Sequence, residues 1–215
     1  MAPRRAARRA DSLPIPAYLI EINDERILVD TGLHPGAARD AGAHYKTEAL
    51  DGFELEQDAS VADQLNLETV TRVILTHLHF DHAGGLPLLP ANVPVVLQRR
   101  EWEAGRDDEA IRRNFYLPRD YAHIAEQLVL VDGDHDLLGD GSIQLLLTPG
   151  HTPGHQSIRV GSQLVTSERA VSIRADAPGS LRTQLRRYQR PRAQKSTARP
   201  PSTVAVTEFL AARTF

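Results

Sequence analysis

"VILTHLHFDHAGGLPLLP", residues 73–90, places three histidines and an aspartate within six positions, directly after an apolar run. The whole chain of 215 residues has only nine histidines, so a third of them gather in this stretch. The β-branched residues at 70–76 predict a buried strand, and the cluster begins where that strand ends. Side chains at a strand end can converge on one point, so we treat four residues as candidate metal ligands: His77, His79, Asp81 and His82.

The residue types of this cluster limit the metal chemistry. Imidazole and carboxylate groups bind zinc, and they also suit iron, manganese or nickel. The chain contains no cysteine, which excludes a disulfide framework and any thiolate metal site. A tetrahedral site therefore needs a further ligand of the same types from elsewhere in the sequence.

A second histidine-bearing stretch, "LLLTPGHTPGHQS" at residues 145–157, offers that ligand. His151 follows a predicted strand, and His155 is an alternative. Three histidines, His77, His79 and His151, would leave a fourth position for water, which is the arrangement of a catalytic zinc site. Asp81 and His82 then point to a second metal nearby.

The order of predicted elements indicates an α/β fold. Apolar runs on both sides of a turn at residues 23–25 predict a hairpin, and Ser60 is a candidate N-cap for a helix at 59–67. Residues 101–116 are predicted to form another helix. Alternating segments predict the other strands, at 93–97, 128–131, 143–147, 156–160 and 163–166. Strands with interspersed helices favour two stacked sheets covered by helices, an αββα sandwich.

Three motifs carry a family resemblance. "THLHFDHAGG", "TPGHTPGHQS" and the upstream "ILVDTGLHPG" resemble the metallo-β-lactamase fold superfamily, and specifically its N-acyl homoserine lactonase branch. Three segments favour that branch over the β-lactamases and glyoxalase II: the motif "HFDHAGG", the segment "VVLQRREWEA" and the loop "HTPGHQS". The resemblance covers residues 15–167, and it implies a metallo-β-lactamase-like sandwich.

The resemblance also implies roles for individual residues. The first zinc ion would be held by His77, His79 and His151, and the second by Asp81 and His82. A metal-bound hydroxide would open the ring of an N-acyl homoserine lactone, while Asp81 orients the hydroxide and passes its proton to the leaving alkoxide. Asp30 matches a buried aspartate that supports the site. An acyl chain would need an apolar wall, and the candidate residues are Leu33, Phe80, Trp102 and Phe115. Each of them fits a position in the core better.

The chain departs from the family pattern after His155, which no histidine follows. The family has a bridging aspartate, then a tyrosine and a final histidine in this region. Glu168 and Asp176 are candidates for the bridging position, whereas Tyr188 lies too far along the chain to match the tyrosine. The second metal site is thus predicted to be incomplete, and two alternatives stay open. One is a non-catalytic or mono-metal relic, and the other is a related esterase or thioesterase.

Charge divides the chain into unequal parts. Residues 1–168 carry 15 Lys and Arg against 26 Asp and Glu, whereas residues 169–215 carry 10 against 2. We expect a flexible segment at 1–14, a metallo-β-lactamase-like domain at 15–168 that is incomplete at its C-terminus, and a basic, disordered tail at 169–215. A shift of reading frame near residue 167 would explain the change of composition, and a divergent tail is the competing explanation.

The resemblance implies a small lactone or ester as the substrate. The basic tail lacks any recognisable nucleic-acid-binding module. No apolar run approaches the roughly 20 residues that a membrane helix needs, and the first 20 residues lack a secretory apolar region. We therefore expect a cytoplasmic protein that binds neither nucleic acid nor membrane. The sequence leaves the oligomeric state open.

Overall fold

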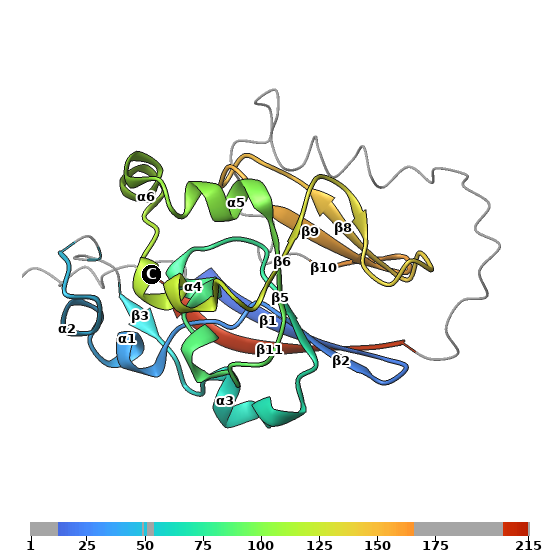
Figure 1. Cartoon of the computed structure of the whole chain (residues 1–215). Helices are drawn as coiled ribbons and strands as arrows, with labels where there is room; N and C mark the ends of the chain where they lie inside the picture. Colours follow the sequence, from blue (N-terminus) through green and yellow to red (C-terminus); the bar gives the residue numbers. More distant parts are fainter. Residues whose placement is uncertain (1–12, 49, 51–53, 166–203, 215) are drawn as a thin grey trace, which may run out of the picture.

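The computed structural model describes residues 13–48, 50, 54–165 and 204–214, which form two β-sheets with helices (Figure 1). The larger sheet has seven strands in the order β3-β11-β1-β2-β4-β5-β6, and the smaller has four in the order β10-β9-β8-β7. The strands of the larger sheet are β1 (Leu13–Ile22), β2 (Glu25–Val29), β3 (Leu55–Glu56), β4 (Arg72–Ile74), β5 (Val95–Gln98), β6 (Leu128–Val131) and β11 (Val204–Thr214). Those of the smaller sheet are β7 (His135–Asp136), β8 (Ile143–Leu147), β9 (Gln156–Val160) and β10 (Gln163–Val165).

The larger sheet is mixed in direction. Strands β11, β1 and β2 pair antiparallel, and β2, β4, β5 and β6 pair parallel. The carboxyl ends of parallel strands meet at one edge of a sheet, where α/β proteins place their sites. The loops after β2, β4 and β5 therefore open onto the same edge.

Side-chain alternation gives the larger sheet two apolar faces. Ile74 and Val96 belong to a cluster that also contains Ile143 and Ile158 of the smaller sheet, so this face packs sheet against sheet. The neighbouring residue Val73 belongs to a second cluster with helix and loop residues. Because successive strand residues point to opposite faces, both faces of the parallel strands are buried. The described residues thus form three layers: helices, the larger sheet and the smaller sheet.

The helices are short. They are α1 (Pro35–Arg39), α2 (Ala41–Tyr45), α3 (Val61–Gln64), α4 (Phe80–Ala83), α5 (Arg99–Ala104) and α6 (Asp108–Asn114), with 3-10 turns at Leu67–Thr69, Leu86–Leu88, Pro118–Asp120 and Ala122–Ile124. Ser60 caps α3 as predicted and forms a reciprocal capping box with Asp63. The single helix predicted at 101–116 is wrong: the chain divides into α5 and α6, because Asp107 accepts from the backbone of Ala110 and starts a new helix.

Most predicted strands are confirmed. The hairpin of β1 and β2 forms around the expected turn, and β6, β8 and β9 have the predicted bounds. Strand β4 is shorter than residues 70–76, and β1 begins at Leu13, inside the segment expected to be flexible. The Gly- and Pro-containing stretch at residues 31–42 contains α1 and the start of α2. Within the described ranges, no helix is long and apolar enough to cross a membrane.

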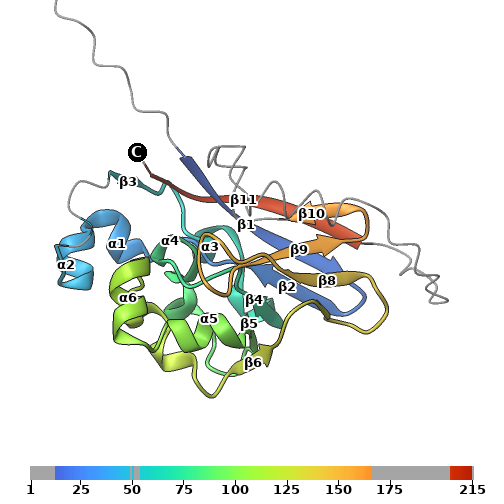
Figure 2. The same ribbon diagram turned by 90° about the horizontal axis from the view of Figure 1, so that it is seen from above.

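The C-terminal strand β11 corrects the predicted disorder for residues 204–214 alone. Residues 204–214 pair with β1 along its whole length, from Leu13 opposite Thr214 to Ile22 opposite Val204 (Figure 2). The cause is long-range: β1 offers a free edge to a proline-free segment that carries one basic residue, Arg213. Residues 1–12 and 166–203 lie outside the described part of the chain, so their predicted flexibility and the proposed frame shift near residue 167 stay predictions.

Candidate metal centre

The histidine stretch occupies the loop between β4 and α4 and the helix α4 itself, at the carboxyl edge of the parallel strands. His77 is fully buried, and His79 is the N-cap residue of α4. Their ring centroids lie 4.6 Å apart. The strand end and the short helix thus hold two imidazoles face to edge at one point.

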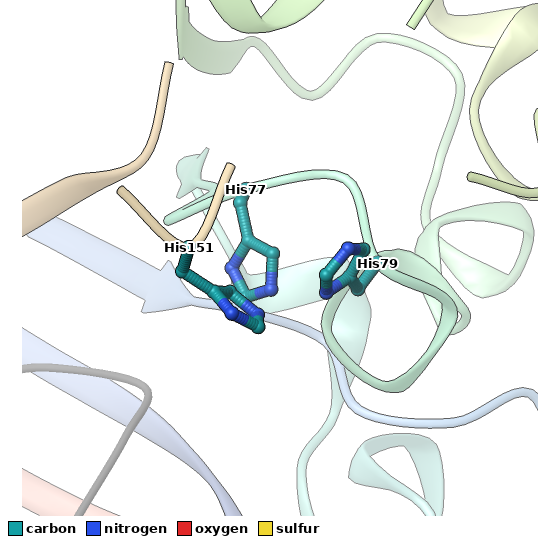
Figure 3. A group of neighbouring side chains, drawn as sticks. All are labelled: His77, His79 and His151. Carbon is teal, nitrogen blue, oxygen red and sulfur yellow. The ribbon is translucent and has the colours of Figure 1, made fainter. Parts of the chain in front are cut away.

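His151 reaches the same point from the loop between β8 and β9 of the smaller sheet (Figure 3). Its ring centroid lies 4.8 Å from that of His77 and 4.6 Å from that of His79. One ring nitrogen from each of the three histidines lies within 4.8 Å of the others. Among the residues that the structure describes, no other set of three His, Asp or Glu meets this criterion.

The buried nitrogens of this group suit a metal ion. The Nε2 atoms of His77 and His79 are buried without a hydrogen-bond partner, which is costly unless a ligand satisfies them. Burial lowers the pKa of His79 to about 4 and holds that of His77 well below the usual imidazole range, so both rings are neutral at pH 7. Neutral imidazoles with available lone pairs are the form that binds divalent metals.

A hydrogen-bond relay from Asp30 fixes the tautomer of His77. Asp30 follows β2, and its carboxylate accepts from the backbone N–H and the hydroxyl of Thr76 at 2.7 and 2.8 Å. Since that hydroxyl donates to Asp30, its oxygen accepts the Nδ1 proton of His77 at 2.9 Å. Nε2 of His77 then carries the lone pair that faces the site. The predicted supporting role of Asp30 thus has a physical basis.

Asp81 and His82 lie beside the three-histidine group but are not members of it. The His82 ring is 4.3 Å from that of His77, with Nδ1 3.0 Å from Asp30 Oδ2 and Nε2 3.5 Å from Asp81 Oδ2. Burial disfavours the charged ring, but the carboxylates of Asp81 and Asp30 outweigh it and raise the pKa of His82. Burial likewise opposes ionisation of Asp81, and His82 outweighs it and lowers the pKa of Asp81. Their assignment to a second metal stays a prediction.

His155, the alternative to His151, has a different environment. It is fully buried, and its Nδ1 lies 2.9 Å from the hydroxyl of Thr148. Its ring centroid lies 5.2 Å from that of His77, but the three-nitrogen group contains His151 instead. Glu168, Asp176 and Tyr188 lie outside the described residues.

The residues considered for an acyl-chain wall divide into two groups. Leu33, Phe80 and Trp102 are buried and belong to apolar core clusters. Phe115 is 55% exposed and takes a left-handed conformation at the end of α6, so its predicted core position is wrong. A residue that ends a helix with positive φ turns away from the helix face that its spacing predicts.

One buried charged residue near the site was missed by sequence reasoning. Glu101 lies in the first turn of α5, is fully buried, and accepts hydrogen bonds from both histidine-bearing loops. Burial raises the pKa of Glu101, and its hydrogen bonds oppose that rise. A glutamate in the first turn of a helix is usually a solvated residue. Its position directly after the buried strand β5, on the edge that carries the histidines, was the available signal.

Two facing sheets, with a histidine metal centre at one edge, define a class of metal-binding α/β sandwich. The family model described as "Metallo-beta-lactamase superfamily" matches residues 10–165. The chain therefore belongs to the metallo-beta-lactamase superfamily, which also confirms the predicted α/β sandwich.

Several known proteins and solved structures are similar to this chain in sequence or in fold. An N-acyl homoserine lactonase from Bacillus sp is 34% identical over 159 residues, covering 70% of this chain and 60% of the relative. One from Bacillus thuringiensis is 34% identical over 168 residues, covering 72% and 63%. The crystal structure of a quorum-quenching N-acyl homoserine lactone lactonase has a TM-score of 0.53 at 30% identity, covering 69% of this chain and 56% of that one.

Another similar solved structure is that of an N-acyl homoserine lactone hydrolase with the product N-hexanoyl-L-homoserine bound at its catalytic metal centre. Its TM-score is 0.54 at 25% identity, and the match covers 69% of this chain and 68% of that one. The present chain thus spans 60–63% of the length of the curated relatives described above.

Proposed function

We propose that this chain is a metal-dependent hydrolase that opens the ring of N-acyl homoserine lactones. The observation that carries the proposal is the convergence of His77, His79 and His151, with one nitrogen of each within 4.8 Å of the others. The similarity to N-acyl homoserine lactonases at 34% identity supports the substrate class. We propose zinc as the metal, with iron, manganese or nickel as alternatives that the same nitrogen ligands accept.

The ligand set supports a catalytic rather than a structural centre. Three histidine ligands leave one position of a tetrahedron for water or substrate. The exposed His151 completes the group next to the buried His77, so the centre lies where solvent reaches the edge of the two sheets. When bound, a zinc ion lowers the pKa of a water ligand to about 7 and polarises a carbonyl oxygen.

Side chains around the centre would transfer a proton from the attacking water to the leaving group. We propose that the carboxylate of Asp81, whose side chain is 19% exposed, orients the attacking water and accepts its proton. Attack on the lactone carbonyl breaks the bond between the acyl carbon and the ring oxygen. Asp81 then delivers the proton to the leaving alkoxide, and the product is an open-chain hydroxy acid. In a chain that holds a single ion, His82 would hold Asp81 in place, since its Nε2 lies 3.5 Å from Asp81 Oδ2.

Asp81 and His82 are also proposed as ligands of a second ion. The competing proposal is a relic of the family that binds one metal ion and has no catalytic activity. One observation favours it: Asp81 and His82 lie outside the three-histidine group found among the described residues. An esterase or thioesterase of the same fold is a third candidate, because loops rather than the fold set substrate preference. The predicted cytoplasmic location stays a prediction.

The test is hydrolysis of N-hexanoyl homoserine lactone, followed by proton release in weak buffer, with and without added zinc. Lactone opening by the zinc-loaded chain, faster than turnover of simple esters and thioesters and lost in His77→Ala, is the expected result. Faster turnover of esters or thioesters would favour the third candidate. No hydrolysis of any substrate by a chain that holds a single ion would favour the relic, whereas about two ions per chain is the content expected of the enzyme.

A further inference from the structure

The buried carboxylate of Glu101 lies between the two loops that supply the three histidines. It follows β5 on α5, is fully buried, and accepts four hydrogen bonds. A carboxylate has about four lone-pair sites, so its accepting capacity is fully used. Burial of a carboxylate costs free energy unless hydrogen bonds compensate, and here all of them come from residues around the candidate site.

The two oxygens of Glu101 serve different loops. Oε1 accepts from the backbone N–H of Leu78, between His77 and His79, at 3.0 Å, and from the Tyr116 hydroxyl at 2.7 Å. Oε2 accepts from the loop that carries His151, namely from the Thr152 hydroxyl at 2.9 Å and the Gly154 N–H at 2.8 Å. One rigid carboxylate therefore sets the separation between the two histidine-bearing loops.

The backbone approach at Gly154 shows how closely the second loop is held. A Cβ at this position would lie 2.3 Å from the backbone nitrogen of Glu101 and 2.6 Å from its Cα. No other residue type fits without moving the loop or α5. The His151 loop thus packs directly on the turn of α5 that presents Glu101.

Tyr116 extends the same network toward the metal ligands. Its hydroxyl donates to Glu101, and its ring centroid lies 5.6 Å from that of His79. Glu101 thus connects to His77 and His79 through Leu78 and Tyr116, and to His151 through Thr152.

We infer that Glu101 is the positioning residue of the metal centre: it holds the loop of His77 and His79 in register with the loop of His151, so that the three nitrogens are arranged before the ion binds. This inference rests on the three-histidine centre of the proposed function, but it does not depend on the substrate. Pre-arranged ligands bind a metal more tightly than ligands that must first be brought together, and loss of an outer contact of this kind weakens metal affinity by about 10–100-fold.

The test compares zinc affinity in the wild type, Glu101→Gln and a control, Glu103→Gln. Glu103 is an exposed residue of the same helix, and its replacement changes charge without touching either loop. Glutamine preserves the size of Glu101 but has one acceptor oxygen, so one loop loses its anchor. Competition with a chromophoric chelator gives the zinc affinity, and the visible spectrum of the cobalt-substituted protein reports the ligand geometry.

We expect zinc binding about 10–100-fold weaker in Glu101→Gln, with a changed cobalt spectrum, and Glu103→Gln like the wild type. If Glu101 only stabilised the fold, Glu101→Gln would lower the thermal unfolding temperature of the metal-free protein while zinc affinity and cobalt spectrum stayed unchanged. That result would overturn the inference. A wild-type chain that binds no zinc would instead overturn the metal centre itself, and this role with it.

A second variant covers the case in which Glu101→Gln does not fold. Thr152→Val removes one donor to Oε2 and leaves the carboxylate in place. Loss of one hydrogen bond corresponds to about 3–10-fold, which we expect to appear as weaker zinc binding by the folded protein. Zinc affinity equal to the wild type in a folded Thr152→Val protein would contradict the inference.

Discussion

Replacement of Asp30 by alanine should destabilise the metal-free protein by a large and calculable amount. The Asp30 carboxylate is buried and accepts from the Thr76 N–H, the Thr76 hydroxyl and His82 Nδ1 at 2.7, 2.8 and 3.0 Å. In Asp30→Ala the Thr76 hydroxyl can turn to His77 Nδ1, but the Thr76 N–H and His82 Nδ1–H keep no acceptor. Each buried donor without a partner costs about 1–3 kcal/mol, so the total is about 2–6 kcal/mol.

Asparagine at the same position separates the charge from the hydrogen bonds. Asp30 has a φ of 57°, a left-handed conformation that asparagine tolerates. Its amide oxygen can accept from the Thr76 N–H, and its NH₂ group can donate to the Thr76 hydroxyl. Only His82 then loses its acceptor, which predicts a cost of about 1–3 kcal/mol for Asp30→Asn.

Urea unfolding of the metal-free variants measures these costs. Asp24→Ala is the control, because Asp24 is exposed in the turn between β1 and β2, and its loss should change stability by less than about 0.5 kcal/mol. The expected order of destabilisation is Asp30→Ala, then Asp30→Asn, then Asp24→Ala. A cost for Asp30→Ala below about 1 kcal/mol would refute the hydrogen bonds from the Thr76 N–H and His82 Nδ1 to the Asp30 carboxylate.

Three further changes test other parts of the structure. Gly32→Ala should destabilise β11 by at least about 1 kcal/mol, because its Cβ would lie 2.5 Å from that of Ala211 and its φ is +67°; urea unfolding indistinguishable from wild type would show that β11 does not pack there. Burial raises the pKa of Asp120 to about 7, so its contribution to stability falls as the pH rises from about 4 to 7. Asp120→Asn should remove that slope in thermal unfolding of the metal-free protein, and equal slopes in both proteins would contradict the shift. Asp81→Asn should keep zinc at the three histidines while lactone hydrolysis falls about 100-fold or more, and unchanged hydrolysis would exclude Asp81 from catalysis.

Local patterns predicted those parts of the fold in which each residue's neighbour is close in sequence. Strands β8 and β9 were located to the residue, because their apolar runs end at clear turns. Strand β11 was missed for the opposite reason. Its partner β1 lies almost 200 positions away, and the arginines and prolines of residues 169–203 hid its short proline-free run. Pairing between distant segments leaves no periodic signal in either one alone.

Sequence patterns likewise predicted only some of the residues of the candidate site. His77, His79 and His151 could be found because each follows a strand, and strand ends at one sheet edge converge. The role of Glu101 could not be found, since it depends on two loops that meet only in the folded chain. The choice between His151 and His155 also needed the structure, because both lie in the same loop between β8 and β9.

Zinc bound per chain, measured by equilibrium dialysis of the wild type and of His151→Ala, tests the three-histidine centre most directly. His151 is the single ligand supplied by the smaller sheet and is exposed, so its removal should leave the core intact. We predict at least one zinc ion per chain in the wild type at micromolar free zinc, and loss of most of that zinc in His151→Ala. Equal zinc content in the two proteins would show that the metal does not bind between the two loops.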